Sequence, residues 1–178
     1  AATAIDDASG NSYAGINDAT TLNFIAVDNV SPTLASTTPA DNATGVVPSA
    51  NIVLTFSENV QVGSGNITIF KSDNTQVEAI DVTSGQVTVS GAAVTVNPSS
   101  NLDSFQGYYL KVAATAIDDL SGNSYSGIND TTTFNFTTGD GQAPTVLITG
   151  PSGLTAVNGA FTATATFSEN VTGFVLGD

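Results

Sequence analysis

Apolar and polar residues alternate with a period of two along the middle of the chain. This alternation predicts half-buried β-strands, because successive side chains of a strand point to opposite faces of a sheet. Short runs of Gly, Ser, Asn and Asp separate the alternating segments and predict turns. No segment shows the period of a long amphipathic helix. The alternating apolar positions are Ile52, Leu54 and Phe56; Ile67 and Ile69; Ile80 and Val82; Val94 and Val96; Tyr108, Leu110, Val112 and Ala114; and Phe134 and Phe136.

The number and composition of these segments predict an all-β fold. About seven short strands in roughly 110 residues, rich in Val, Thr and Ile, are typical of an immunoglobulin-like β-sandwich. The chain contains no Cys and no Trp, so the disulfide and the core Trp of antibody domains are missing. We therefore expect the architecture of that fold without its antibody hallmarks.

A long internal repeat organises the chain. Residues 1–24 recur as residues 113–136, at an offset of 112 and with 20 of 24 positions identical, and the sequence TFSENV of residues 55–60 returns at residues 166–171. Repeats of this length indicate tandem domains. We predict one complete immunoglobulin-like repeat over residues 28–138, the C-terminal part of a repeat over residues 1–27, and the N-terminal part of another over residues 139–178. On this interpretation the sequence is a fragment of a longer array.

The charge balance limits the classes of molecule that the chain is expected to bind. The chain has 16 acidic residues and only two basic ones, Lys71 and Lys111, which gives a net charge of −14. Nucleic acids and anionic membranes are bound through clustered Lys and Arg, so neither is an expected partner. No apolar run reaches the length of about 20 residues that spans a bilayer. The expected partners are cations, neighbouring repeats of the same chain, and copies of the chain in a surface layer or filament.

Catalysis has few candidate groups. His and Cys are both absent, which removes Ser-His and Cys-His nucleophile arrangements and leaves carboxylates as the only general bases. Two carboxylates can hydrolyse glycosides, but Asp118 and Asp119 lie in a loop that is repeated nearly verbatim at Asp6 and Asp7. A loop repeated in successive domains favours a modular role. We therefore expect no enzyme.

Acidic residues are predicted to converge at one pole of the complete repeat. If successive strands alternate in direction, the segments that end near Glu58 and Asp119 both return to the pole where the linker enters at Asp28. Calcium fits such a set, because it takes six to eight oxygen ligands in loose geometry and needs neither His nor Cys. The competing interpretation is that these residues form ordinary solvated turns. The predicted calcium ligands are Asp28, Asn29, Glu58, Asp118, Asp119 and Asn123, with Asp130 nearby, Asp140 and Glu169 in the following unit, and Asp6, Asp7 and Asn11 in the preceding one.

Several motifs together resemble the SbsA-type bacterial Ig-like family. They are Pro32-Thr33, the stretch PADNATGV at residues 39–46, IVLTFSE at residues 52–58, Tyr108 at the start of a strand, DDLSGN at residues 118–123, and Phe134-Asn135-Phe136. The resemblance covers the whole middle repeat. It implies a spacer or wall-building module of extracellular or cell-surface bacterial proteins such as S-layer proteins and adhesins. The alternative is a glycan- or ligand-binding accessory module of a secreted protein.

Overall fold

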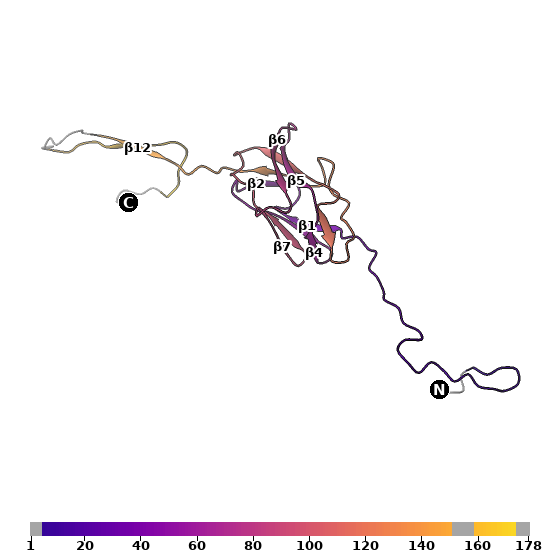
Figure 1. Ribbon diagram of the computed structural model, residues 1–178. Coiled ribbons are helices and arrows are strands. Elements are labelled where there is room, and N and C mark those ends of the chain that lie inside the picture. The colour runs from indigo at the N-terminus through magenta and orange to yellow at the C-terminus, as the bar shows by residue number, and fades with distance from the viewer. Residues whose placement is uncertain (1–4, 151–158, 174–178) are drawn as a thin grey trace.

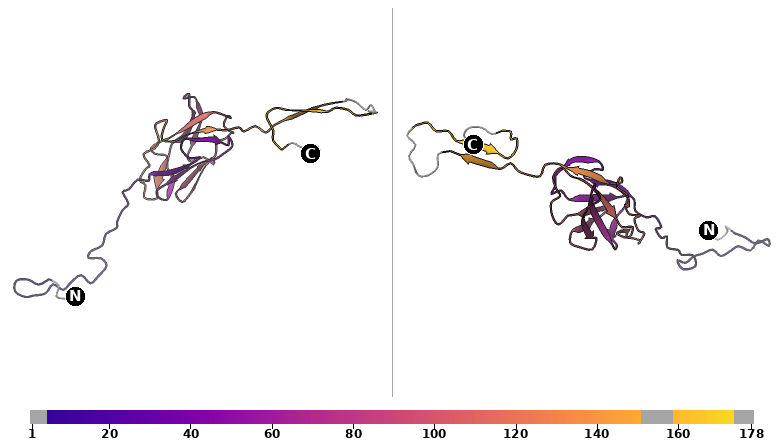
Figure 2. Two further views of the ribbon diagram at one scale, coloured as in Figure 1. Left: turned by 180° about the vertical axis from the view of Figure 1, so that it is seen from behind. Right: turned by 90° about the horizontal axis from the view of Figure 1, so that it is seen from above.

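The central domain lies between two extended flanking segments. The computed structural model describes residues 5–150 and 159–173, and Figure 1 shows the order of its elements. Figure 2 shows the same arrangement from behind and from above. The described residues form thirteen strands. Over the described residues, no helix is long and apolar enough to cross a membrane.

Two sheets form the central domain. The first has the order β1-β3-β8-β7 and the second the order β2-β11-β9-β5-β6; all neighbours are antiparallel except β2 and β11, which are parallel. These two orders match the ABED and A′GFCC′ sheets of an immunoglobulin-like sandwich. The strands are β1 (Leu34–Thr38), β2 (Ala43–Val46), β3 (Ile52–Phe56), β5 (Asn66–Lys71), β6 (Gln76–Asp81), β7 (Val87–Ser90), β8 (Ala93–Val96), β9 (Gly107–Val112) and β11 (Asn135–Thr138).

A small third sheet closes the pole at which the chain enters the domain. It pairs β4 (Val60–Val62) with β10 (Ile117–Asp119), and Asp119 lies opposite Val60. This pairing brings the end of β10 beside the loop that follows β3. We refer to this end of the domain as the N-pole and to the opposite end, where β11 leaves, as the C-pole.

The predicted apolar positions fill the space between the two sheets. All of them are buried except Ala114, which is exposed because β9 ends at Val112 and the chain turns there. β3 shows the expected alternation, with Ile52, Leu54 and Phe56 buried and the residues between them half-buried. The core cluster lies entirely within residues 52–136. The central domain therefore encloses its own core.

A buried tyrosine fixes the C-pole loop that precedes β9. The hydroxyl of Tyr108 accepts a hydrogen bond of 2.8 Å from the backbone N–H of Asp103. This is the tyrosine corner of immunoglobulin-like domains, in which a Tyr near the start of the F strand bonds to the backbone a few residues upstream. The hydroxyl of Thr138, at the end of β11, donates to the carbonyl of Asp103 at 2.6 Å. The loop is thus held from two strands.

The C-terminal flanking segment repeats the first strands of the domain. β12 (Val146–Thr149) and β13 (Thr164–Phe167) form an antiparallel pair in which Val146 lies opposite Phe167, as Leu34 lies opposite Phe56 in β1 and β3. The two-way hydrogen bonding of Thr33 with Ser57 recurs between Thr145 and Ser168. The sequence repeat is therefore also a repeat of local structure.

Most apolar side chains of both flanking segments are exposed, among them Leu22, Phe24, Leu147 and Ile148. Neither segment encloses a core within its described residues. Residues 1–4 of the first predicted unit, and residues 151–158 and 174–178 of the last, lie outside the described residues.

Candidate cation site at the N-pole

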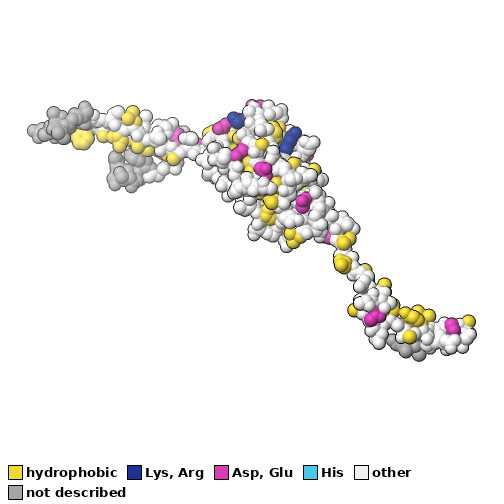
Figure 3. All heavy atoms as spheres, in the orientation of Figure 1, with side chains coloured by type: hydrophobic (Ala, Val, Ile, Leu, Met, Phe, Trp, Pro, Cys, Tyr) yellow, Lys and Arg dark blue, Asp and Glu magenta, His cyan; other side chains and the backbone are white. Residues whose placement is uncertain are grey.

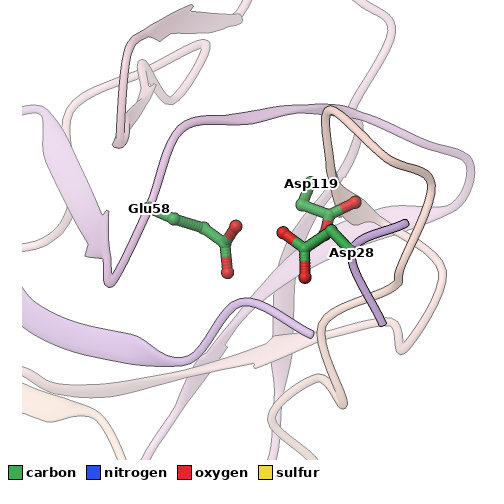
Figure 4. A group of neighbouring side chains, drawn as sticks. All are labelled: Asp28, Glu58 and Asp119. Carbon is green, nitrogen blue, oxygen red and sulfur yellow. The ribbon is translucent and has the colours of Figure 1, made fainter. Parts of the chain in front are cut away.

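Three carboxylates from distant parts of the sequence meet at the N-pole. One oxygen atom from each of Asp28, Glu58 and Asp119 lies within 4.8 Å of the other two. Asp28 comes from the entering linker, Glu58 from the loop between β3 and β4, and Asp119 from the end of β10. Figure 4 shows the Glu58 side chain extending toward the other two carboxylates. The predicted convergence at this pole therefore holds for these three residues.

Asp119 is the anchor of the group. It is only 1% exposed, and its carboxylate accepts the backbone N–H groups of Ser121 at 2.8 Å and of Asn123 at 2.7 Å and the amide of Asn123 at 2.7 Å. Burial favours the neutral form, but these donors outweigh it and hold the pKa of Asp119 below its ordinary value. Asp119 is therefore a fixed, ionised carboxylate.

The pKa of Glu58 is shifted in the opposite direction to that of Asp119. Desolvation raises the pKa of Glu58, and the negative charges of Asp28 and Asp119 raise it further. Ionising Glu58 therefore costs more free energy in the folded protein than in the unfolded chain. Like charges brought together in this way are relieved by a divalent ion.

Asp28 is held in place by the backbone around it. The amide nitrogen of Asn123 donates to the backbone carbonyl of Asp28 at 3.0 Å, and the N–H of Val30 donates to the Asp28 carboxylate at 3.0 Å. Asn123 therefore connects the linker to the Asp119 loop. Its amide nitrogen faces both acidic residues, so its role in this geometry is to position them.

The donor set suits a hard cation. All three side chains offer carboxylate oxygen, and calcium accepts such oxygens together with carbonyls and water. No His or Cys is present in the chain, so the soft and imidazole ligands preferred by zinc and copper are missing. The three residues could therefore hold a hard cation such as calcium or magnesium.

Other predicted ligands lie outside the group of three. Asp118 points to the other side of β10, where the Ser124 hydroxyl donates to it at 2.6 Å and a side chain at Gly63 would meet its carboxylate. Neighbouring residues of a strand point to opposite faces, so Asp118 and Asp119 cannot both face the site. Asn29 is exposed on the linker. Asp130 accepts hydrogen bonds from Thr132 and Thr133 and closes a turn.

The flanking segments carry partial copies of the arrangement. In the following unit, burial raises the pKa of Glu169, and Asp140 raises it further by its charge and by a hydrogen bond, so the negative charge of the linker residue acts on this Glu as that of Asp28 acts on Glu58. In the preceding unit, Asp7 accepts the N–H groups of Ser9 and Asn11 and the Asn11 amide, all at 2.9 Å. Asp6 repeats the position of Asp118 through its bridge to Ser12.

One contributor was not predicted from the sequence. The side chain of Gln61 in β4 donates to the backbone carbonyl of Asp119 at 2.8 Å and braces the end of β10. Only the pairing of β4 with β10 brings Gln61 near this loop. The available signal was the repeated D-x-S-G-N pattern, which occurs at residues 7–11 and 119–123 and encodes the Asp119 loop itself.

Acidic side chains are spread over the domain and both flanking segments, and the two lysines lie on the domain (Figure 3). Lys71 pairs with Asp103 at 2.7 Å, and the Lys111 amine lies 5.8 Å from the centroid of the Phe70 ring. Neither lysine is part of the group of three acids. Among the described residues, no other three acidic side chains come as close together.

Comparison with known proteins gives a family match. A family model described as a bacterial Ig-like domain matches residues 28–138. No curated protein matches the chain. A solved structure of CopC from Methylosinus trichosporium OB3b is similar to 61% of this chain and 93% of its own length, with 14% identity and a TM-score of 0.44.

Proposed function

Because the chain belongs to the bacterial Ig-like domain family, we propose that it is a non-catalytic structural repeat of an extracellular bacterial surface protein, with joints stiffened by calcium. Such a protein would be an adhesin stalk, an S-layer or an extracellular filament. The repeated linker and strand contacts support a tandem arrangement. Its partners are then neighbouring repeats of the same chain and copies of the chain.

The observation that carries the calcium part is the origin of the three carboxylates. Two belong to the body of the domain, and Asp28 belongs to the linker that enters it. A cation held by all three ties the linker to the domain. Calcium would then limit the angles that adjacent repeats adopt, and a chain of repeats would behave as a stiff rod.

Thermal unfolding with and without calcium tests this proposal. We expect the melting temperature of residues 28–138 to rise in millimolar calcium and to fall back in EDTA, because an ion that binds only the folded state stabilises it. Magnesium at the same concentration controls for ionic strength. If the melting temperature does not change in calcium, the proposed role of calcium is wrong, while the proposed role as a structural repeat is unaffected.

A second candidate is a ligand-binding module. The outer face of the second sheet has a hollow of about 770 Å³. Its walls are mostly polar and neutral, which suits a polyhydroxylated ligand such as a glycan. Within it, the Tyr109 hydroxyl donates to Asn74 at 2.9 Å. The lining residues are Ser72, Asn74, Gly107, Tyr108, Tyr109, Thr131, Asn135, Phe136 and Thr137. Binding of residues 28–138 to a glycan array, lost in Asn135→Leu, would favour this function.

A further inference from the structure

The linker between repeats is held from both sides. On the C-pole side, the N–H of Gly139 donates to the carbonyl of Val46 at 2.8 Å, and the N–H of Gly141 donates to the Ser104 hydroxyl at 3.1 Å. A side chain at Gly141 would clash with Pro48. Residues 139 and 141 are thus fixed on the preceding repeat.

The residue between them belongs to the following repeat. The carboxylate of Asp140 accepts the N–H of Gln142 at 2.9 Å, as that of Asp28 accepts the N–H of Val30, and the charge of Asp140 raises the pKa of Glu169 in the loop after β13. Asp28 is the equivalent linker residue of the complete repeat, and Asn123 of the N-pole bonds to its carbonyl. Three consecutive residues, which span about 7 Å between their outer Cα atoms, are therefore shared between two repeats. The facing poles must lie against each other.

Each pole presents an uncovered apolar side chain beside this linker. At the C-pole, Phe105 is 74% exposed, and its N–H bonds to the carbonyl of Gly139. Its φ of 56° lies in the left-handed region, which is unusual and costly for a bulky residue. At the N-pole, Leu120 is 68% exposed and lies in the loop that Asn123 ties to Asp28. The repeat bears a strained, exposed aromatic residue that contributes nothing to its own core.

From these observations we infer that Phe105 packs against the N-pole loop of the following repeat, on the residue equivalent to Leu120, and forms a direct apolar contact between repeats. This inference rests on the tandem-repeat part of the proposed function and is independent of calcium. The occupant is the next repeat because the linker leaves no length for another partner between the poles. The contact covers one exposed apolar side chain from each of the two facing poles and accounts for the strained conformation of Phe105.

A two-repeat protein tests the contact. Joining residues 28–145 to residues 34–138 keeps the native linker between two complete repeats, each with a closed core. In EDTA, Phe105→Gly in the first repeat is expected to raise the rate of linker cleavage by proteinase K about tenfold, as expected when part of the burial of one Phe is lost. Val77→Thr, a change at an exposed apolar residue of the β6 edge, should leave the rate unchanged.

Two further measurements complete the test. In a single repeat, Phe105→Gly should leave the melting temperature unchanged or raise it, because Gly adopts positive φ without strain. Leu120→Ala in the second repeat should raise cleavage alone and add little to Phe105→Gly, since both remove one contact. Equal cleavage of wild type and Phe105→Gly, or a lower melting temperature of the single-repeat variant, would overturn the inference. If Phe105→Gly speeds cleavage in EDTA but calcium does not change the melting temperature, the contact between repeats stands and only the calcium part of the proposed function is rejected.

Discussion

The tyrosine corner offers the sharpest test of how the C-pole is held. Tyr108→Phe keeps the ring and its packing against Phe136, whose centroid lies 5.8 Å away, and removes only the hydroxyl. The backbone N–H of Asp103 then loses its acceptor at 2.8 Å in a partly buried position. Leaving such a donor unpaired costs about 1–3 kcal/mol. Water can partly reach this loop, so we expect a loss of about 1.5 kcal/mol.

Urea denaturation of residues 28–138 measures this loss. The midpoint should fall while the slope m stays constant, because the variant exposes the same surface on unfolding. For a domain of this size the melting temperature should fall by about 6 °C. The control is Tyr109→Phe, which removes a hydroxyl that donates to Asn74 on the outer face and leaves an acceptor that water can satisfy. We expect that change to cost about 0.5 kcal/mol.

The comparison of the two variants decides the question. If Tyr108→Phe costs no more than Tyr109→Phe, the Tyr108 hydroxyl does not hold the loop and our explanation is wrong. The loop also carries Ser104, which binds the linker at Gly141. In the two-repeat protein, Tyr108→Phe should therefore also speed cleavage of the linker.

Two other pairs of variants follow from the structure. In EDTA at pH 7, Glu58→Gln should raise the melting temperature, because the raised pKa of Glu58 means that its ionisation destabilises the fold; the gain should vanish as the pH falls below about 4.5. Glu78→Gln should lower the melting temperature, because hydrogen-bond donors outweigh burial and lower the pKa of Glu78. If both substitutions shift the melting temperature in the same direction, the electrostatic explanation is wrong. Gly127→Ala should cost more than about 3 kcal/mol, since the new Cβ would lie 2.5 Å from the carbonyl oxygen of Val112 at a φ of 81°. Gly122→Ala, at a φ of 90° in open space, should cost about 1 kcal/mol. If urea denaturation gives equal losses of unfolding free energy for the two variants, the steric explanation is wrong.

The strands of the core could be predicted from sequence because alternation reports burial directly. Ile52, Leu54 and Phe56 of β3 are buried as expected. The prediction fails at Ala114, which continues the alternation in sequence but follows the end of β9. A strand ends where its hydrogen-bonding partners end. Residues after that point leave the sheet even when they are apolar.

The sequence predicted which pole of the domain carries the candidate site, but not which acidic side chains face it. Strand direction alone brought Asp28, Glu58 and the Asp118-Asp119 pair to one end of the domain. Which of the two neighbouring acids faces the site depends on the pairing of β10 with β4, and a shift of one residue would exchange them. The role of Phe105 was also hidden, because its exposure and positive φ are properties of the folded loop.

The parallel pair of β2 and β11 would carry load if the domain were stretched from its two ends. These strands lie near the two ends of the domain in sequence, and Phe136 pairs with Ala43 and Thr138 with Val46. When the neighbouring repeats pull on both ends, β2 and β11 are drawn in opposite directions along their length. Their hydrogen bonds are then loaded together in shear and cannot open one after another. In a filament built from such repeats, the pairing of β2 with the last strand, β11, would resist stretching once the load has passed β1.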